Sequence, residues 1–430
     1  MTAIPVAQPG SRDPRRRDRP DTTIEPEEVA ARVVSDRAEG EAYVASVCFK
    51  HGPPRLLGVE LEYLVHDVID PARPLTAARL ATALGPHAPR TLVPDSPASP
   101  LPAGSALTLE PGGQVEVSTA PAASFRALVE AAEHDLAYVA DRLASAGLRL
   151  GSEAIDAFRA PSRLLTTPRY AAMERRFAPR GPGGITMMCS TAALQVCVDA
   201  GEASEAPRRW AAAHALGPVL LALFANSRRH AGVDTGLASA RWRSVMDTEP
   251  CRTVAQQPCD DPAGSWASRV LDTPLMVVRR PGVSWDAPAG LTFADWIEAR
   301  GEAAALPRPT FGDLSYHLTT LFPPVRPHGH LEIRYLDAQP VQQWAPPVAL
   351  LAALLSTPST VDSALELCEP VAGQWDAAAQ HGTDDVALAA AARAVGELGC
   401  AALSDLDLPD HTITDIAGAV ERRWRRCERE

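Results

Sequence analysis

The chain has 430 residues, of which 46% are hydrophobic and 22% charged, and its formal net charge is −12. That length fits one large domain or two ordinary ones, and the acidic balance argues against a nucleic-acid partner, which needs an excess of basic residues on the protein. Lys50 is the only lysine and His51 follows it, so the glycine-rich phosphate loop that ends in Lys-Ser or Lys-Thr is excluded.

The first segment, residues 1–26, carries an arginine cluster interrupted by proline and aspartate, which predicts a disordered tail. The remaining residues, 27–430, are expected to form a single catalytic domain whose last part, about 346–427, is helical. The sequence shows no secretion signal, no CxxC pair and no apolar run approaching the ~20 residues that span a bilayer. We therefore expect a cytoplasmic protein with free thiols and no membrane partner.

Two kinds of periodicity predict the secondary structure of this domain. Helical spacing or alanine-rich sequence predicts helices over residues 27–48, 76–84, 124–147, 207–226, 347–356, 385–403 and 413–427. Strict alternation predicts strands over residues 57–66, 108–110 with 114–118, 193–199, 314–321 and 330–336. The order shows no steady strand–helix–strand repeat. The expected fold is therefore α+β, with a mainly antiparallel sheet and helices packed on its apolar face.

Each predicted strand has one apolar and one polar face, because successive side chains point to opposite sides. The polar faces hold Glu60 with Glu62, Gln114 with Glu116 and Ser118, Gln195, His330 with Glu332 and Arg334, and Ser315 with His317 and Thr319. If these strands form one sheet, their carboxylates converge and repel one another unless cations neutralise them. Such clusters suit Mg²⁺ or Mn²⁺, especially with phosphate as a further ligand. The alternative is an ordinary half-exposed sheet with glutamates facing solvent.

Two features favour the metal and phosphate interpretation. Gly112 and Gly113 closely follow Glu110, so the backbone there is able to turn tightly or approach a ligand. Glu332 and Arg334 set an acid and a cation on one face, and an arginine fork grips phosphate or carboxylate with two bonds.

Other residues have both a functional and a structural interpretation. His317 and His330 are candidates for a general base, although a histidine bonded to a structural neighbour is commoner. Cys189 and Cys197 either contact a thiol substrate or fill apolar space. Trp242 and Trp344 either stack on adenine or pack against other residues, and Asp337 is either a ligand or a turn residue.

Six segments in this order resemble the successive motifs of glutamate–cysteine ligases, in the branch shared by plants and many bacteria. They are GVELEY (58–63), LEPGGQVEVSTAP (109–121), MMCSTAALQVCVD (187–199), ALFANSR (222–228), RWRSVMDTEPCRT (241–253) and YHLTTLFPPVRPHGHLEIRYLDAQP (316–340). The preference for arginine over lysine and the short chain are similar to the actinobacterial enzymes that make γ-glutamylcysteine for ergothioneine biosynthesis.

The resemblance implies a curved antiparallel sheet like that of glutamine synthetase, with Mg²⁺ (or Mn²⁺) and ATP on its acidic face. The positions that match metal ligands are Glu60, Glu62, Glu110, Glu116 and Glu332. Arg334 matches an arginine that contacts the transferring phosphoryl group or glutamate, and Glu332 and Arg334 are the expected catalytic residues. Gln195 matches a position in the substrate pocket. Arg243 and Arg252 match a loop that binds nucleotide phosphates or substrate.

The implied reaction joins L-glutamate to L-cysteine through a γ-glutamyl phosphate, with ATP converted to ADP and phosphate. The expected partners are these small molecules, and no protein partner is evident. One alternative is a ligase that joins glutamate to a different amine. The other is a metal-dependent phosphate hydrolase, because acidic clusters also serve such enzymes.

Overall fold

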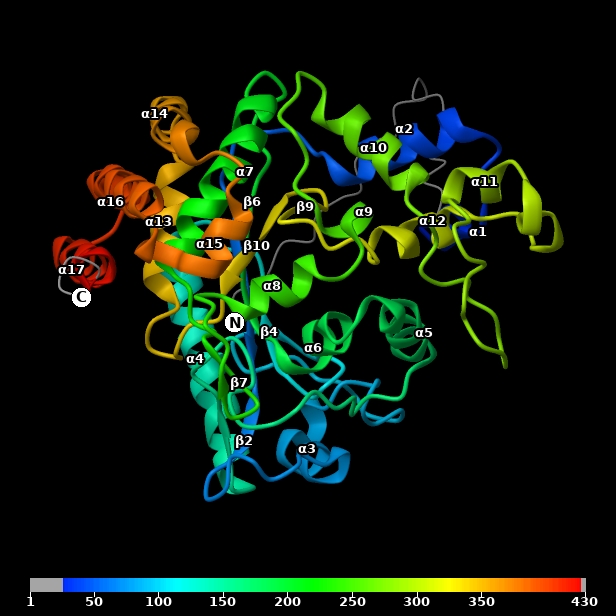
Figure 1. Cartoon of the computed structure of the whole chain (residues 1–430), viewed down its shortest axis with the longest axis horizontal. Helices are drawn as coiled ribbons and strands as arrows, with labels where there is room; N and C mark the ends of the chain where they lie inside the picture. Colours follow the sequence, from blue (N-terminus) through cyan, green and yellow to red (C-terminus); the bar gives the residue numbers. More distant parts are fainter. Residues whose placement is uncertain (1–25, 427–430) are drawn as a thin grey trace, which may run out of the picture.

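The computed structural model describes residues 26–426, which are organised around a six-stranded sheet (Figure 1). The strands follow the order β3 (Ala106–Leu109), β4 (Val115–Ser118), β1 (Leu57–Tyr63), β6 (Ala193–Val198), β10 (Leu331–Asp337) and β9 (Val325–Pro327). Every neighbouring pair in this sheet is antiparallel, which confirms the α+β prediction. Two short ribbons pair β2 (Val65–Asp67) with β5 (Leu148–Leu150) and β7 (Arg229–His230) with β8 (Val233–Asp234).

One face of the sheet is apolar and lies against helices. Val59, Val117 and Ile333 are at most 1% exposed on that face. They are covered by α4 (Phe125–Ser145) and α7 (Ala206–Leu223), which contact β1, β4 and β10. α4 begins where the Ser124 side chain accepts a hydrogen bond from the Ala127 N–H, the ordinary way to satisfy a free donor at a helix start. Both helices were predicted from their spacing.

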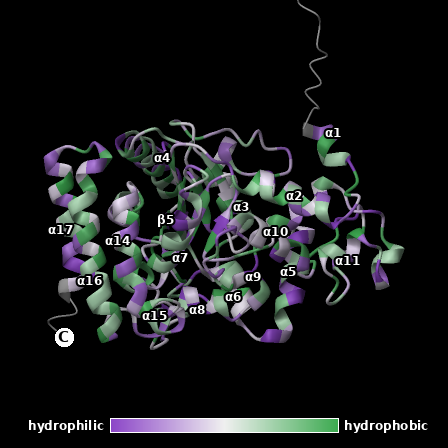
Figure 2. Ribbon diagram, turned by 90° about the horizontal axis from the view of Figure 1, so that it is seen from above, coloured by the Kyte–Doolittle hydropathy of each residue, from purple (hydrophilic) through white to green (hydrophobic). Residues whose placement is uncertain are grey.

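The C-terminal helices form a further layer outside α7 (Figure 1). They are α13 (Ala345–Leu354), α14 (Pro358–Cys368), α15 (Trp375–His381), α16 (Val386–Ala401) and α17 (Asp410–Arg426). In Figure 2, α17 carries both hydrophilic and hydrophobic residues, whereas α16 is mostly apolar. A Cβ on Gly396 would lie 2.2 Å from the Trp424 ring, so glycine lets these two helices approach closely. The segment Val386–Leu406 is apolar and long enough to cross a membrane, but it packs between helices and is partly buried, as core helices are.

The polar face of the sheet is covered by a different set of helices, on the opposite side in Figure 1. These are α5 (Pro168–Phe177), α6 (Gly183–Ser190) and α8 (Ala240–Met246). The remaining helices are α1 (Pro26–Ala31), α2 (Arg37–Cys48), α3 (Ala77–Leu84), α9 (Pro250–Thr253), α10 (Pro262–Asp272), α11 (Phe293–Ile297) and α12 (Phe311–Leu318).

The strand predicted over residues 314–321 is wrong, because residues 314–318 lie in α12 and the chain turns directly after it. The side chains of Thr310 and Asp313 each accept from the backbone N–H of the other, a capping box that starts a helix. Phe311, Leu314 and Leu318 are buried at helical spacing. Ser315, His317 and Thr319 therefore do not share a strand face.

The helix predicted over residues 27–48 is two helices, α1 and α2. Between them Val33 forms a β-bridge with Thr310, and the Asp36 side chain caps α2 by accepting from the Glu39 N–H. The predicted tail, residues 1–26, lies outside the described residues except for its last member. That residues 27–430 form one catalytic domain stays a prediction.

Candidate active site

A cavity of about 320 Å³ lies between the polar face of the sheet and helices α5, α6 and α8. The sheet contributes Glu60 and Glu62 from β1, Glu116 from β4, Gln195 from β6 and Arg334 from β10. Four of the five predicted strand segments therefore bring polar side chains to one place, because their strands belong to the same antiparallel sheet.

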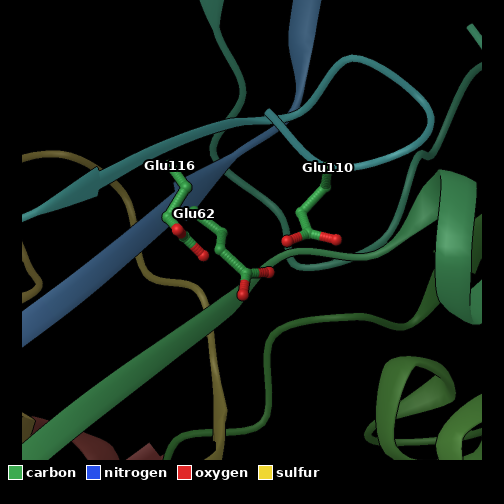
Figure 3. Close-up of side chains that lie close together, drawn as sticks. All are labelled: Glu62, Glu110 and Glu116. Atoms are coloured by element: carbon green, nitrogen blue, oxygen red, sulfur yellow. The ribbon is translucent and has the colours of Figure 1, made fainter. Parts of the chain in front are cut away.

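Three glutamates form a compact cluster in this cavity (Figure 3). Glu62 and Glu116 are directly opposite in the register of β1 and β4, so their side chains leave the sheet on the same side. Glu110 approaches from the turn after β3, and carboxylate oxygens of the three residues lie within 4.8 Å of one another. Glu60 lines the same cavity. Carboxylates so close together are the hard oxygen donors that Mg²⁺ and Mn²⁺ prefer.

The turn that carries Glu110 depends on two glycines. Gly113 has φ +90°, a conformation that residues with a Cβ rarely adopt. A Cβ on Gly112 would lie 2.1 Å from the carbonyl oxygen of Cys189. The backbone is thus close to helix α6, and this close packing sets where Glu110 enters the cavity.

The charges of these glutamates are not balanced by the protein. Burial, together with repulsion from neighbouring carboxylates, raises the pKa of Glu60 and of Glu110 to about 8. Burial and the charge of Glu62 raise the pKa of Glu116 to about 7. Burial also raises the pKa of Glu62, although Gln195 donates to its Oε1 and Ala193 N–H to its Oε2, both at 2.7 Å. A cluster in which ionisation is unfavourable fits bound cations, which would favour the charged form.

Glu332 differs from the other predicted metal ligands. Arg326 donates from Nε and Nη2 to its two oxygens, each at 2.8 Å, and Arg334 donates to Oε1. Burial would raise its pKa, but these arginines outweigh burial and lower the pKa to about 2. Glu332 does not line the cavity, so this geometry favours an anchor for two arginines over a metal ligand or a group that touches substrate.

Arg334 reaches the cavity in a fixed orientation. Its Nη1 donates to Glu332 and to the Oε1 of Gln195, and Gln195 in turn donates to Glu62. Gln195 therefore joins the arginine to the carboxylate cluster. The carboxylates of Glu332 and Glu60 outweigh burial and raise the pKa of Arg334, so it is always charged.

The motif at residues 241–253 contributes a different arginine from those predicted. Arg252 is fully buried and binds Glu249 and the Thr320 carbonyl, and Arg243 is half exposed and pairs with Asp247. Neither lines the cavity. Arg241 does. Residues two apart on a helix point in nearly opposite directions, so in α8 either Arg241 or Arg243 was able to face the cavity, but not both.

Arg326 was not predicted from the sequence, although a signal for it was present. Gly329 lies at the turn between β9 and β10 with φ +74°, and Arg326 and Glu332 are each three residues from it. A hairpin centred on this glycine pairs them, as the register shows. Arg169, also missed, lines the cavity from α5, and nothing in its sequence context indicated this.

One part of the cavity lining, the apolar wall, is rich in sulfur. It is formed by Met173, Met187, Met188, Tyr170 and Phe322. Methionine side chains are flexible and polarisable, so such a wall adapts to small apolar or sulfur-containing groups.

The residues left open by the sequence mostly have structural roles. His317 is 4% exposed, its Nε2 lies 3.0 Å from the Val270 carbonyl, and burial lowers its pKa to about 3. His330 lies outside the cavity lining, and so do Cys189 and Cys197, whose thiol pKa values are raised by burial. Trp344 is a core residue, whereas Trp242 lines the cavity. Asp337 ends β10, is fully buried, and is neither in the cavity lining nor in a turn.

Comparison with known proteins gives concordant matches. The family model described as Glutamate-cysteine ligase family 2 (GCS2) matches residues 56–428. A protein of Mycobacterium tuberculosis, "Glutamate--cysteine ligase EgtA", is 38% identical over 396 residues, which cover 90% of this chain and 87% of the relative. The chloroplastic glutamate–cysteine ligase of Brassica juncea is 31% identical over 61% of this chain and 52% of that protein.

A solved structure supports the same fold. The glutamate–cysteine ligase of Francisella tularensis, determined in complex with AMP, superposes with a TM-score of 0.51 at 12% identity. The match covers 89% of this chain and 83% of that one. At this identity the likeness concerns the fold alone, the glutamine-synthetase-like arrangement of a mainly antiparallel sheet with helices on its apolar face.

Proposed function

The chain belongs to glutamate–cysteine ligase family 2, and from that premise we propose that it forms γ-glutamylcysteine from L-glutamate, L-cysteine and ATP. The observation that carries this proposal is the meeting, in one cavity, of four glutamates with Arg241, Arg326 and Arg334. Such a cavity holds both the negative charges of a metal–nucleotide site and the cations that bind phosphate and carboxylate groups. The names of the relatives support the choice of glutamate and cysteine.

The chemistry requires activation of glutamate before the peptide bond forms. A carboxylate repels an incoming amine and has no leaving group, so ATP first transfers its γ-phosphoryl group to the γ-carboxylate. The amine of cysteine then attacks the acyl phosphate, and phosphate leaves. Phosphoryl transfer of this kind is catalysed mainly by positioning and by neutralising charge, which is what the cavity residues offer.

The glutamates and Arg334 have different roles in this reaction. Glu60, Glu62, Glu110 and Glu116 would hold Mg²⁺ or Mn²⁺, which when bound neutralises the negative charge of the ATP phosphates. Arg334, held by Glu332 and Gln195, stabilises negative charge on the transferring phosphoryl group.

Arg241 binds a carboxylate of glutamate. Its side chain is 4% exposed and it lines the cavity, so a substrate carboxylate there would meet a desolvated guanidinium.

The covering helices α5 and α6 exclude water from the acyl phosphate.

The apolar wall supports a thiol-bearing acceptor. Met173, Met187 and Met188 offer no partner for a hydroxyl group or a charge, so cysteine should be favoured over serine. Family membership favours a ligase over the metal-dependent phosphate hydrolase considered from the sequence. The relatives named EgtA support assignment to the ergothioneine-type branch of the family.

The test is incubation of the protein with ATP, Mg²⁺, L-glutamate and L-cysteine, followed by measurement of γ-glutamylcysteine and ADP. The proposal predicts equal amounts of both products and no ADP when glutamate is omitted. Serine and ethylamine in place of cysteine test the acceptor. Equal rates with all three amines would contradict cysteine specificity, and release of phosphate from ATP in the absence of glutamate would contradict the ligase itself.

A further inference from the structure

Asp337 is a buried carboxylate that the proposed reaction does not use. It is 0% exposed and ends β10. A bulge in the pairing of β10 with β6 places it opposite Ala193, on the same side as Gln195, because residues opposite one another in register share a face. Without that extra residue Asp337 would point to the apolar side. This explains why simple alternation gave no indication of its role.

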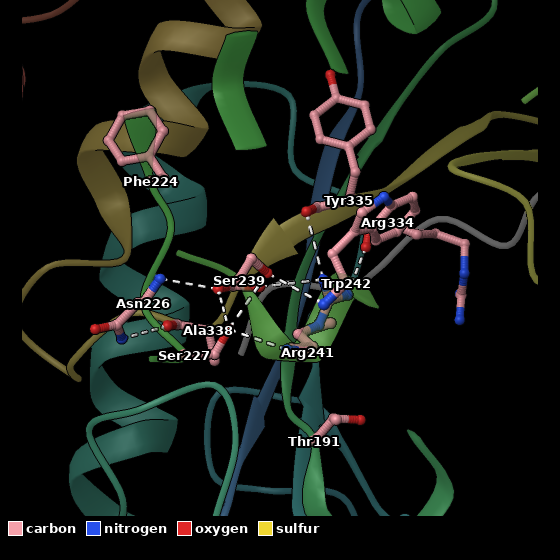
Figure 4. A network of polar contacts seen from close by, with 12 residues as sticks. Thr191, Phe224, Asn226, Ser227, Ser239, Arg241, Trp242, Arg334, Tyr335 and Ala338 are labelled. Atoms are coloured by element: carbon pink, nitrogen blue, oxygen red, sulfur yellow. Dashed lines mark hydrogen bonds and ion pairs between the residues drawn. The ribbon is translucent and has the colours of Figure 1, made fainter. Parts of the chain in front are cut away.

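Both oxygens of Asp337 are fully engaged. Oδ2 accepts from the Asn226 N–H at 2.8 Å and from the Ser227 hydroxyl at 2.7 Å. Oδ1 accepts from the Ser239 hydroxyl at 2.9 Å and from Nη1 of Arg241 at 3.4 Å. Figure 4 shows Ser227 and Ser239 side by side between Asn226 and Arg241.

The two serine hydroxyls connect Asp337 to the backbone of helix α8. A hydroxyl has one hydrogen, and each serine gives it to Asp337. The oxygen of Ser227 therefore accepts from the Arg241 N–H, and that of Ser239 from the Trp242 N–H, both at 3.1 Å. Arg241 and Trp242 are the two residues of α8's first turn that line the cavity. One carboxylate thus sets both the backbone and the guanidinium of this turn.

The guanidinium of Arg241 has a bound side and a free side. Nη1 donates to Asp337 and to the Tyr335 carbonyl, and Nη2 donates to the Arg334 carbonyl at 2.6 Å. Within residues 26–426, Nε–H and one Nη2 hydrogen have no protein acceptor. Nε and Nη2 form the edge with which arginine grips a carboxylate by two parallel bonds.

We propose that Asp337 is a positioning residue that, together with Ser227 and Ser239, holds Arg241 with its free edge toward the amino-acid substrate. This inference rests on the proposed function and adds to it the group that orients the glutamate-binding arginine. The charge of Asp337 also opposes the attraction of Arg241 to Glu62, whose carboxylate acts on Arg241 from the cavity side. Without Asp337 the buried guanidinium would turn toward Glu62 and lose its grip on substrate.

The test compares Asp337→Asn with wild type in kcat, in KM for glutamate and in KM for ATP. Asparagine keeps the size but donates where the carboxylate accepted, so one serine loses its orientation. We expect KM for glutamate to rise about 10- to 100-fold, as when a group that orients a metal-binding side chain is removed, with KM for ATP changed less than twofold. In an Arg241→Gln background, Asp337→Asn should cause no further loss.

Asp135→Asn is the matched control. Asp135 is also 0% exposed and accepts from two backbone N–H groups, of Ala103 and Ser105, but it lies outside the cavity lining. Its substitution should lower the melting temperature without changing either KM. If Asp337→Asn does not fold, Ser239→Ala replaces it, with the same expected rise in KM for glutamate alone.

Equal changes in both KM values, or losses that add to those of Arg241→Gln, would overturn the inference and leave Asp337 a structural residue. Wild-type protein that forms no γ-glutamylcysteine would instead contradict the proposed function.

Discussion

At the scale of residues, the glutamates of this protein fall into two groups by what balances their charge. Glu332 is held by two arginines and its pKa is lowered to about 2. Glu110 and Glu116 face other carboxylates across the cavity, and burial with this repulsion raises their pKa values to about 8 and about 7. The same residue type thus supplies a structural anchor in one place and, as we propose, a group that would bind a cation in another.

Glu116→Gln should remove activity while leaving the fold stable. Its Oε1 accepts from the Thr108 hydroxyl, a bond that glutamine retains, and loss of one charge relieves repulsion in the cluster. We expect turnover to fall by about 10²–10³, the usual effect of removing one electrostatic group. Without metal, the melting temperature should be equal to wild type or higher. Enzyme assays with a Mg²⁺ titration and thermal melts measure both.

Glu130→Gln is the control, because Glu130 pairs with Arg126 on the surface and should change neither quantity. A Glu116→Gln enzyme with normal activity and normal Mg²⁺ dependence would remove Glu116 from the metal site.

Glu332→Gln should behave in the opposite way and destabilise the protein. It leaves Arg326 and Arg334 without their shared buried partner, and breaking such a pair costs about 3–5 kcal/mol. Because the folded pKa lies below the ordinary value, the stabilisation is present above about pH 4.5 and is lost as the pH falls toward about 2. Urea unfolding of both proteins at pH 7 and at pH 3 checks this. An equal stability difference at the two pH values would be inconsistent with the ion pair.

Alternation along the strands predicted correctly that Glu60, Glu62, Glu116, Gln195 and Arg334 meet in one cavity. It did not reveal which acids are neutralised, because that depends on arginines from other elements. Arg326 comes from a three-residue strand, too short to show alternation, and the only signal for it was the hairpin centred on Gly329.

At the scale of elements, local sequence predicted the longest helices, among them α4, α7, α16 and α17, and four of the five strand segments, but it missed shorter helices such as α5, α6, α8 and α10. The exception among the strand segments is α12, which shows why a short segment is difficult to assign from its sequence. Its residues alternate over a short stretch, but the capping box of Thr310 and Asp313 and the spacing of Phe311, Leu314 and Leu318 are helical signals. Over eight residues the period of a strand and the period of a helix are hard to distinguish, and the capping box is the signal that indicates a helix.

Gly112→Ala tests how the turn between β3 and β4 positions Glu110. A methyl group there would meet the carbonyl oxygen of Cys189 at 2.1 Å, so the turn must move away from helix α6 and take Glu110 with it. We expect a higher Mg²⁺ requirement and about tenfold or more lower activity, as for small displacements of positioned groups. Steady-state kinetics against Mg²⁺ concentration measure this.

Gly52→Ala serves as the comparison, since no atom lies within 4 Å of its added methyl and its φ is not positive. Unchanged Mg²⁺ dependence in Gly112→Ala would show that the close packing against α6 does not set the position of Glu110.

At the scale of the whole molecule, two helical layers have separate tasks. α4 and α7 cover the apolar face of the sheet and the C-terminal helices pack outside α7, while α5, α6 and α8 cover its polar face (Figure 1). This division lets the polar face carry unbalanced charge, since the core on the other face supplies the stability. The sequence predicted the sheet and its core, but not which helices enclose the cavity, because that depends on contacts distant in the chain.

Stability without metal should therefore decrease as the pH rises. Glu60, Glu110 and Glu116 have folded pKa values above the ordinary 4.5, so between about pH 4.5 and 8 the folded state binds more protons than the unfolded state. The free energy of unfolding then falls with increasing pH over that range. Mg²⁺ should restore stability most at the upper end, with release of protons. Thermal melts with EDTA or with Mg²⁺ at pH 6 and 8 measure this stabilisation by Mg²⁺. A Mg²⁺ effect that does not depend on pH would contradict the prediction.

We propose that this cavity activates the γ-carboxylate of glutamate by phosphorylation. Glutamate labelled with ¹⁸O in the γ-carboxylate, incubated with ATP, Mg²⁺ and cysteine, tests this proposal. We expect each phosphate released to carry one ¹⁸O atom from glutamate, in step with the γ-glutamylcysteine formed. Phosphate without the label, released while the product forms, would contradict it.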